Sequence, residues 1–358
     1  MACCIAQIVA DRHTVSTGGE FEVSIRHPRH CDAAPRAPIS LWRLKVSLPS
    51  LLVLIPMHPE QLSALQTHFD VAYHPSYHPA PQGWGPDGER ARFVLTHGAR
   101  GLSAAELSHL PNVALVSALG AGYENLDVAA MRSRNIVAVN GAGANAPTVA
   151  DQGFALLLAA VRRIPAYDAA CRKGVWRDAL PMQPGVSGKK LGIVGLGAVG
   201  RQFAKRGEGF DMQIGYRNRN RRDDAPAHYQ YFDSVLALAE WADYLVVTAP
   251  GGAQSHHLVN AEVLRALGKH GFLVNLGRGS VVDTAALADA LRDGVIAGAG
   301  LDVYEGEPSP PAALIDLQNV VLSPHVAGRS PEAEAATLAL FLENARRFQA
   351  GEPVLTPL

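Results

Sequence analysis

The segment LGIVGLGAVGRQFAKR, residues 191–206, decides the fold of this chain. A short apolar run leads into the glycine-rich sequence 195–200, and an amphipathic segment begins directly after it. A strand, a glycine-rich turn and the start of a helix therefore follow one another. This is the context that a GxGxxG motif needs in order to bind a dinucleotide.

Each glycine of this motif has its own expected role. Gly195 allows the tight turn, Gly197 leaves no side chain between the backbone and a pyrophosphate, and Gly200 lets the helix close on the strand. The pyrophosphate would lie at a helix N-terminus, where free N–H groups and the positive end of the helix dipole favour an anion. We therefore expect the three glycines, with Ala198 and Val199 between them, to bind a cofactor.

The composition is that of an ordinary soluble globular protein. The 358 residues are 48% hydrophobic and 18% charged, with a formal net charge of -1. This length is sufficient for two domains, each with its own core. A net charge near zero gives no reason to expect nucleic acid or an anionic membrane as a partner. No run of about 20 apolar residues occurs, so no membrane-spanning segment is expected.

Residues 1–44 show neither strand nor helix period, so we expect a poorly ordered tail or an extension that reflects the assumed translation start. The first residues lack a basic region ahead of their short apolar run, and they make a poor signal peptide. Three cysteines lie in this tail and Cys171 stands alone. Neither a disulfide framework nor a CxxC pattern is present, so we expect a cytoplasmic protein without a metal site.

Strand and helix patterns alternate through the first half of the chain, which predicts a small parallel α/β domain. The expected strands are 51–57, 71–75, 91–98, 114–122 and 136–141. The expected helices are 59–69, 103–110 and 125–135, and residues 75–88 are expected to form a loop. Ser103 and Glu106 have the spacing of a capping box at the start of the second helix.

A long apolar helical run, residues 145–172 with Pro165 inside it, is expected to bridge two domains. The strands expected in the second domain are near 191–194, 212–216, 244–248, 272–276, 297–302 and 320–323. Asp283 is expected to cap a helix that Gly294 ends. The final helix, 331–351, is expected to return to the first domain, because it must find an apolar surface to cover.

The end of the expected strand 212–216 indicates which cofactor is used. An acidic residue about 20 positions beyond the glycine motif would bind the ribose 2′-hydroxyl and select NAD. Arg217 occupies this place, followed by Asn218 and Arg219. Guanidinium groups bind a 2′-phosphate through paired hydrogen bonds, so the sequence predicts NADPH, with NADH as a weaker cofactor. The alternative is a solvated loop that happens to hold four arginines between residues 217 and 222.

Three later segments carry polar residues at strand ends, where open α/β sheets bind ligands. Arg278 lies between two glycines just past a strand, and we expect it to bind a carboxylate. Asp302 ends the next strand, and Glu305 competes with Glu307 for an acidic role beside it. His325 follows the last strand and is a candidate general acid or base, whose pKa a buried carboxylate would raise.

Each of these residues also has a plain structural explanation. Arg278 could form a surface ion pair, Glu307 could lie in a solvated loop, and His325 could be an interior histidine with its hydrogen bonds satisfied. Their spacing in the chain does not show that they meet.

Several motifs, in this order, resemble those of the D-isomer-specific 2-hydroxyacid dehydrogenases. They are GLGAVG (195–200), NLGRG (275–279), the EP dipeptide (307–308) and SPHVAG (323–328). The segments SALGAGYENLDV (117–128) and ANAPTVADQGFALLLAAVRR (144–163) are also similar to that family, and the resemblance covers roughly residues 50–350. The arginines after residue 216 and the segment 249–260 look most like NADPH-using glyoxylate/hydroxypyruvate reductases within it.

The resemblance implies two doubly wound parallel-sheet α/β domains. A Rossmann cofactor domain, residues 144–325, would be inserted in a flavodoxin-like substrate domain made of residues 45–143 and 326–358. It also implies a homodimer formed through the cofactor domain, for which the helical run 145–172 is a plausible interface.

The resemblance further implies which residues act. Arg278, Glu307 and His325 would be the catalytic set, since the place ahead of proline favours Glu307 over Glu305. Asp302 matches the family position near the nicotinamide carboxamide. Gly98 and Ala99 match the loop whose backbone amides hold the substrate carboxylate. The expected cofactor-binding set is completed by Thr148, Pro250 and Leu276.

We therefore expect NADPH-dependent reduction of a small 2-oxo acid, of the glyoxylate or hydroxypyruvate type, to the D-2-hydroxy acid. Arg278 would bind the carboxylate, and His325, supported by Glu307, would protonate the carbonyl oxygen as hydride reaches the carbon. The alternatives are a dinucleotide-sensing binding protein of the same fold, or a relative that acts on phenylpyruvate-like substrates or phosphite. His97, beside the carboxylate loop, either binds a substrate hydroxyl or simply packs.

Overall fold

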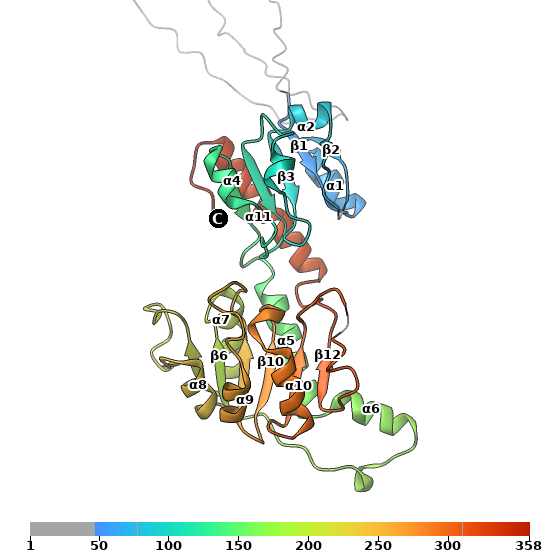
Figure 1. Ribbon diagram of the computed structural model, residues 1–358, viewed down its shortest axis with the longest axis vertical. Coiled ribbons are helices and arrows are strands. Elements are labelled where there is room, and N and C mark those ends of the chain that lie inside the picture. The colour runs from blue at the N-terminus through green and yellow to red at the C-terminus, as the bar shows by residue number, and fades with distance from the viewer. Residues whose placement is uncertain (1–46, 77, 310) are drawn as a thin grey trace, which may run out of the picture. The chain divides into compact units, whose positions relative to one another are not determined.

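The computed structural model describes residues 47–76, 78–309 and 311–358, and the chain divides into two α/β units (Figure 1). The tail expected over residues 1–44 lies outside the described residues. Unit 1 contains the described residues up to Asn140 together with Asn344–Leu358, and unit 2 is Gly141–Glu343. The expected domain boundaries were 143/144 and 325/326. The two units divide at 140/141 and at 343/344, since the first part of the last helix groups with unit 2.

Unit 1 is built on a five-stranded parallel sheet. Its strands are β1 (Ser50–Val53), β2 (Asp70–Tyr73), β3 (Phe93–Thr96), β4 (Leu115–Ala118) and β5 (Val137–Asn140). Their order, β2-β1-β3-β4-β5, is that of flavodoxin. Strands β3 and β4 are buried along their whole length, which is why three of the four residues in each are apolar.

Short helices connect these strands: α1 (Pro59–Gln66), α2 (Pro86–Arg90), α3 (Ala104–Leu107) and α4 (Val128–Ser133). Helix α2 begins inside the segment expected to be a loop, because Pro86 sets up a first helical turn there. The capping box on α3 is confirmed. The Ser103 hydroxyl accepts a bond from the Glu106 N–H at 3.3 Å, and the Glu106 carboxylate accepts one from the Ser103 N–H at 3.0 Å.

Unit 2 is built on a seven-stranded parallel sheet, and the expected fold class is confirmed. Its strands are β6 (Lys190–Val194), β7 (Gln213–Arg217), β8 (Gln230–Tyr231), β9 (Tyr244–Val247), β10 (Phe272–Asn275), β11 (Gly298–Leu301) and β12 (Val320–Leu322). The order β12-β11-β10-β9-β6-β7-β8 is the Rossmann order with one added strand. The order in which successive strands are added to the sheet reverses between β6 and β9. This is the switch point where such sheets bind ligands.

Helices cover both faces of this sheet (Figure 1). They are α5 (Ala146–Val161), α7 (Ala198–Glu208), α8 (Val235–Trp241), α9 (Ala261–Leu267) and α10 (Thr284–Arg292). Two further helices, α6 (Ile164–Arg172) and α11 (Pro331–Gln349), add no residue to the two cores on this sheet. On β9, Tyr244 and Val246 join the core beneath α5 and α7, whereas Leu245 and Val247 join the core beneath α8, α9 and α10. This alternation is the two-residue period of a strand buried on both sides.

The helical run expected to bridge the domains lies within unit 2 and is divided. Helix α5 ends at Val161, and α6 begins after Arg163, whose φ of 51° is left-handed. Pro165 lies in the first turn of α6, where proline costs no hydrogen bond. At α10 the expected cap is confirmed, because Asp283 Oδ1 accepts a bond from the Ala286 N–H at 3.0 Å.

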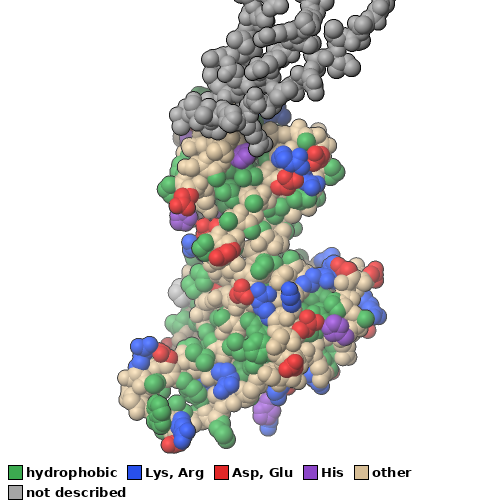
Figure 2. Space-filling model, turned by 180° about the vertical axis from the view of Figure 1, so that it is seen from behind, with side chains coloured by type: hydrophobic (Ala, Val, Ile, Leu, Met, Phe, Trp, Pro, Cys, Tyr) green, Lys and Arg blue, Asp and Glu red, His purple; other side chains and the backbone are tan. Residues whose placement is uncertain are grey.

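The surface mixes charges of both signs. On the face in Figure 2, acidic and basic side chains lie interspersed among polar and apolar ones. Among the residues that the structure describes, no helix is both long enough and apolar enough to cross a membrane.

Candidate active site

The carboxyl ends of six strands in unit 2 carry the expected site residues. Gly195 follows β6, Arg217 ends β7, Pro250 and Leu276 follow β9 and β10, and Asp302 and His325 follow β11 and β12. Because all the strand pairs of this sheet are parallel, these ends share one edge of the sheet.

The glycine motif has the geometry of an anion-binding turn. Gly195 has a φ of 104°, and a Cβ there would lie 2.9 Å from the backbone nitrogen of Ala249. A Cβ on Gly200 would lie 2.3 Å from the Gly195 carbonyl oxygen, so the helix could not approach the strand. At Gly197, the N-cap of α7, a Cβ would meet nothing within 4 Å. The open space therefore lies where a pyrophosphate would meet the free N–H groups.

A pocket of about 1160 Å³ extends from this turn to the end of β7. Arg217, Arg219 and Pro250 line it. Arg217 Nη1 is buried and has no hydrogen-bond partner among the described residues. Burying an unsatisfied donor is costly, so this nitrogen fits an anionic group that enters the pocket. Asn218 Oδ1 accepts a bond from the Leu196 N–H at 2.5 Å, which ties the end of β7 to the glycine turn.

Arg222, a third arginine of this loop, behaves differently. Arg222 forms two hydrogen bonds with Asp224, from Nε at 2.8 Å and from Nη2 at 2.9 Å, and Arg201 also contacts that carboxylate at 2.6 Å. These contacts hold the pKa of Asp224 well below its usual range, with the Arg222 bonds the largest cause. Arg222 therefore fits the structural explanation for the loop, whereas Arg217 fits the cofactor explanation.

The structure brings His325 and Glu307 together. His325 Nδ1 lies 2.6 Å from Glu307 Oε2, and Glu307 Oε1 accepts a bond from the Tyr304 N–H at 2.8 Å. The side chains of His325 and Glu307 are 49% and 30% exposed, so a small molecule can reach them. The hydrogen bond to Glu307 raises the pKa of His325 above 6.5. Burial alone would raise the pKa of Glu307, but the bonds from His325 and Tyr304 reverse this and lower it.

Arg278 lies near enough for its charge to act on both groups. It opposes protonation of His325 and lowers the pKa of Glu307. Its Nη1 donates to the Gly277 carbonyl at 2.7 Å, within the turn between β10 and the next helical turn. The three residues expected to form the catalytic set thus lie in one electrostatic environment.

Asp302 has a task that sequence reasoning missed. Its side chain is buried, and its carboxylate accepts bonds from the Val326 N–H at 3.0 Å, the Ala327 N–H at 2.9 Å and the Ser323 hydroxyl at 2.5 Å. Its backbone carbonyl also accepts a bond from the His325 N–H at 2.9 Å. His325 has a φ of 52°, a left-handed conformation that costs about 1–3 kcal/mol for a residue other than glycine. Asp302 therefore holds the strained loop that carries the histidine.

The two glutamates that compete for the acidic role have different histidine partners. Glu305 contacts a different histidine: its Oε1 lies 2.8 Å from His257 Nε2, and its Oε2 accepts a bond from the Thr284 N–H at 3.0 Å. Glu307, by contrast, is the partner of His325. The loop after β11 thus presents its two carboxylates to two different imidazoles.

Two further members of the expected cofactor set have structural contacts of their own. The Thr148 hydroxyl lies 3.0 Å from the Ser330 hydroxyl. The Leu276 side chain is buried in the core beneath α5, where a Cβ on Gly153 would meet it at 2.2 Å. Only the backbone of Leu276 can therefore face a cofactor.

The expected substrate loop belongs to unit 1. Gly98 and Ala99 follow β3, and a Cβ on Gly98 would lie 2.5 Å from the Gly122 backbone. The loop is braced by Arg100, whose almost fully buried guanidinium donates to the Gly101 carbonyl at 2.9 Å and to Glu106 at 2.7 Å. The sequence analysis did not predict this pair. A buried carboxylate such as that of Glu106 needs a charged or hydrogen-bonding partner, which Arg100 provides.

His97 has a local partner in this loop. Its Nδ1 accepts a bond from the Arg100 N–H at 3.0 Å, and burial lowers the pKa of its imidazole. A neutral, internally bonded imidazole favours the structural alternative for His97 over binding of a substrate hydroxyl.

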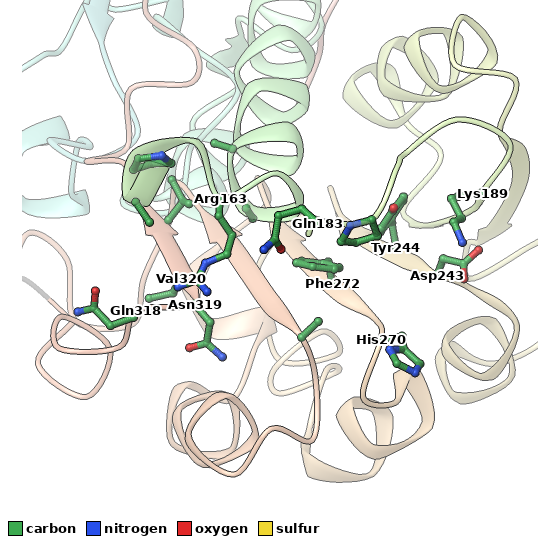
Figure 3. Close-up of a pocket in the computed structure, with 17 residues that line it drawn as sticks. Arg163, Gln183, Lys189, Asp243, Tyr244, His270, Phe272, Gln318, Asn319 and Val320 are labelled. Atoms are coloured by element: carbon green, nitrogen blue, oxygen red, sulfur yellow. The ribbon is translucent and has the colours of Figure 1, made fainter. Parts of the chain in front are cut away.

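A second hollow, of about 390 Å³, lies at the opposite edge of the sheet of unit 2 (Figure 3). Tyr244, Phe272 and Val320, which begin β9, β10 and β12, line it together with Arg163 and Gln183. None of the expected catalytic residues lines this hollow. The candidate site is therefore the carboxyl edge.

Comparisons with known proteins show the family to which the chain belongs. Residues 154–327 match the family model described as the D-isomer specific 2-hydroxyacid dehydrogenase, NAD binding domain. The glyoxylate/hydroxypyruvate reductase HPR3 of Arabidopsis thaliana is 40% identical over 270 residues, which is 75% of this chain and 83% of that protein. The 2-ketogluconate reductase of Gluconobacter oxydans (strain 621H) is 34% identical over 313 residues, 87% of this chain and 99% of that protein.

Among solved structures, an NADPH-dependent glyoxylate/hydroxypyruvate reductase of Sinorhizobium meliloti, in complex with NADP and malonate, has a TM-score of 0.78. It is 35% identical, and the similarity covers 87% of this chain and 97% of that one. This chain belongs to the D-isomer-specific 2-hydroxyacid dehydrogenase family, as its motifs indicated, and it is an enzyme of that family.

The pairing of Glu307 with His325 predicts a change in pH dependence. With His325 as the expected general acid, the rate of carbonyl reduction should fall as pH rises through the raised pKa of that imidazole. Glu307→Gln removes the largest cause of the shift, and burial then lowers the pKa of His325. The decline in kcat/KM is expected to begin at lower pH in the variant.

The measurement is kcat/KM for reduction across pH 5–9, roughly the range in which histidine titrates. Glu305→Gln is the matched control, since its carboxylate contacts His257 instead, and its profile should keep the unmodified midpoint. Identical midpoints for Glu307→Gln and the unmodified protein would show that Glu307 does not tune His325.

Proposed function

We propose that this enzyme reduces a small 2-oxo acid to the D-2-hydroxy acid with NADPH as the cofactor. The observation that carries the proposal is the His325–Glu307 pair, 2.6 Å apart with Arg278 beside it, at the carboxyl ends of the strands that follow the switch point. The glyoxylate/hydroxypyruvate reductases among its relatives support the substrate class.

We assign a separate role in the reaction to each residue of the expected catalytic set, Arg278, Glu307 and His325. NADPH, when bound on the glycine turn, supplies the hydride. Arg278 binds the substrate carboxylate and polarises the carbonyl, because a guanidinium offers paired donors to a carboxylate. His325 donates its proton to the carbonyl oxygen, and Glu307 stabilises the charged imidazole before that transfer. That the backbone amides of Gly98 and Ala99 bind the substrate carboxylate stays a prediction.

The test is oxidation of NADPH and of NADH, followed at the nicotinamide absorbance, with glyoxylate, hydroxypyruvate, pyruvate, 2-ketogluconate and phenylpyruvate. We expect the fastest turnover with NADPH and the small acids. Preference for phenylpyruvate would retain the mechanism and change the substrate class. Tight NADPH binding without turnover of any acid would contradict the proposal and favour a dinucleotide-sensing protein.

The arginines at the end of β7 are expected to set the cofactor preference. Arg217→Ala with Arg219→Ala should raise the KM for NADPH about 10- to 100-fold, since charged hydrogen bonds contribute about 1.5–3 kcal/mol. The KM for NADH, which lacks the 2′-phosphate, should change little. Arg222→Ala is the matched control, because Asp224 already engages that guanidinium. Equal losses for both cofactors would contradict the assignment.

The proposal extends to a cytoplasmic homodimer formed through unit 2. Its support is the segment 164–182, which begins with α6 and projects from this unit in Figure 1. The side chains of Ile164, Trp176 and Met182 in this segment are 55%, 69% and 99% exposed. Large apolar side chains so exposed are typical of a protein–protein interface. Light scattering after size exclusion would measure the mass, and a monomer at micromolar concentration would contradict this part of the proposal.

A further inference from the structure

A cluster of metal-ligand side chains lies outside the catalytic set. His256, His257 and Glu305 each offer one ligand atom, and these atoms lie within 4.8 Å of one another. Within residues 47–76, 78–309 and 311–358, no other group of three histidine, cysteine or carboxylate side chains meets this criterion. The residues come from two loops, one after β9 and one after β11.

Two of the three ligands are already oriented toward each other. His257 Nε2 lies 2.8 Å from Glu305 Oε1, and the two side chains are 35% and 32% exposed. The ring of His256 stacks on that of His257, with 3.9 Å between centroids and 26° between planes. His256 itself is exposed, so rotation about its side-chain bonds can bring its imidazole nitrogen to the pair.

The residues behind the cluster hold His257 and Glu305 in place. Glu305 Oε2 accepts a bond from the Thr284 N–H at 3.0 Å, which leaves Oε1 facing the imidazole. His257 Nδ1 lies 3.7 Å from Asp283 Oδ2, while Asp283 Oδ1 caps α10. The backbone N–H of His257 also donates to the Ser280 carbonyl at 2.8 Å. A carboxylate behind the second nitrogen of a ligating histidine is a common feature of metal sites, because it fixes the tautomer that binds the ion.

We propose that His256, His257 and Glu305 bind a divalent transition-metal ion, with Zn²⁺ as the preferred occupant. Two imidazole nitrogens and one carboxylate oxygen are a ligand set that suits Zn²⁺ at about 2.0–2.2 Å, with water in the fourth position. The ion takes the place of the hydrogen between His257 Nε2 and Glu305 Oε1, and that proton leaves to solvent. Rotation of the exposed His256 closes the remaining distance.

The site joins two segments that the reaction uses. Ser255 and Leu258, on either side of the histidine pair, line the 1160 Å³ pocket, and Glu305 lies two positions before Glu307. A bound ion would fasten the first segment to the second. Zn²⁺ is therefore expected to slow the enzyme without contacting the reacting atoms.

The test is isothermal titration of the metal-free full-length protein with ZnCl₂, using variants that remove one ligand at a time. We expect one Zn²⁺ equivalent that His256→Asn weakens by at least about 10-fold, with the same effect from Glu305→Gln. Asp283→Asn keeps a good helix cap and removes the charge behind His257, so it should weaken the same equivalent about 10- to 100-fold.

His228→Asn is the matched control. His228 pairs with Glu208 at the same 2.8 Å, but no third ligand joins them among the described residues, so this variant should bind Zn²⁺ like the unmodified protein. Zn²⁺ bound elsewhere would persist in every variant. If no Zn²⁺ binds, or if His256→Asn and Glu305→Gln retain every equivalent at unchanged affinity, the proposed site does not exist.

Discussion

Replacing His325 with alanine is expected to lower kcat for reduction of a 2-oxo acid about 10²- to 10⁴-fold, the range that a positioned general acid contributes. The imidazole holds a proton through its bond to Glu307. NADPH affinity should be retained, because the glycine turn and the end of β7 are untouched. Rapid-quench or absorbance kinetics with saturating NADPH would measure the loss.

His270→Ala is a useful comparison for this variant, since His270 is an exposed histidine that lines the hollow at the opposite edge of the sheet. It should retain full activity. A His325→Ala enzyme as fast as His270→Ala would remove His325 from the mechanism. Loss of NADPH binding in His325→Ala would instead show that the loop held by Asp302 had collapsed.

The second large effect is expected at Arg278. Arg278→Ala should lower kcat/KM about 10²- to 10³-fold, which is the cost of removing a donor that stabilises charge developing on a carbonyl oxygen. We expect kcat to fall and the KM for the 2-oxo acid to rise, because the same guanidinium also binds the substrate carboxylate. Arg278→Lys keeps the charge without the planar pair of donors and should recover only part of the loss.

Steady-state kinetics of the two Arg278 variants, together with NADPH binding by fluorescence, would check this expectation. If Arg278→Ala raised only the KM for the 2-oxo acid and left kcat unchanged, Arg278 would bind the substrate without polarising it. If neither constant changed, the carboxylate would be bound elsewhere.

Much of the fold could be predicted because its signals are local. The apolar run before Gly195 and the amphipathic segment after Gly200 sufficed to predict β6, the turn and α7, and the alternation of similar runs indicated parallel sheets. Strand β8 was missed because its two residues, Gln230 and Tyr231, form no apolar run. The division of the last helix between the two units was also missed, since an amphipathic pattern does not tell which surface it covers.

The site could be predicted in position and less well in its contacts. Arg278 and His325 could be predicted to lie at one edge because the carboxyl ends of parallel strands meet there. Their neighbours depend on the path of loops that carry no period. Asp302 binds the backbone of residues 326 and 327, and Glu305 binds His257, 48 positions away. No spacing rule for metal ligands connects such distant residues. The sequence analysis, which expected no metal site, therefore could not predict the cluster of His256, His257 and Glu305.

The switch point between β6 and β9 has a practical consequence for redesign of this enzyme. The residue expected to recognise the 2′-phosphate, Arg217, is carried on one side of it by β7, whereas Arg278 and His325 follow strands β10 and β12 on the other side. Substitutions near Arg217 therefore share no strand with the acid–base machinery. Substitutions near Arg217 are therefore expected to exchange NADPH for NADH as the cofactor while the stereochemistry and the proton transfer stay the same.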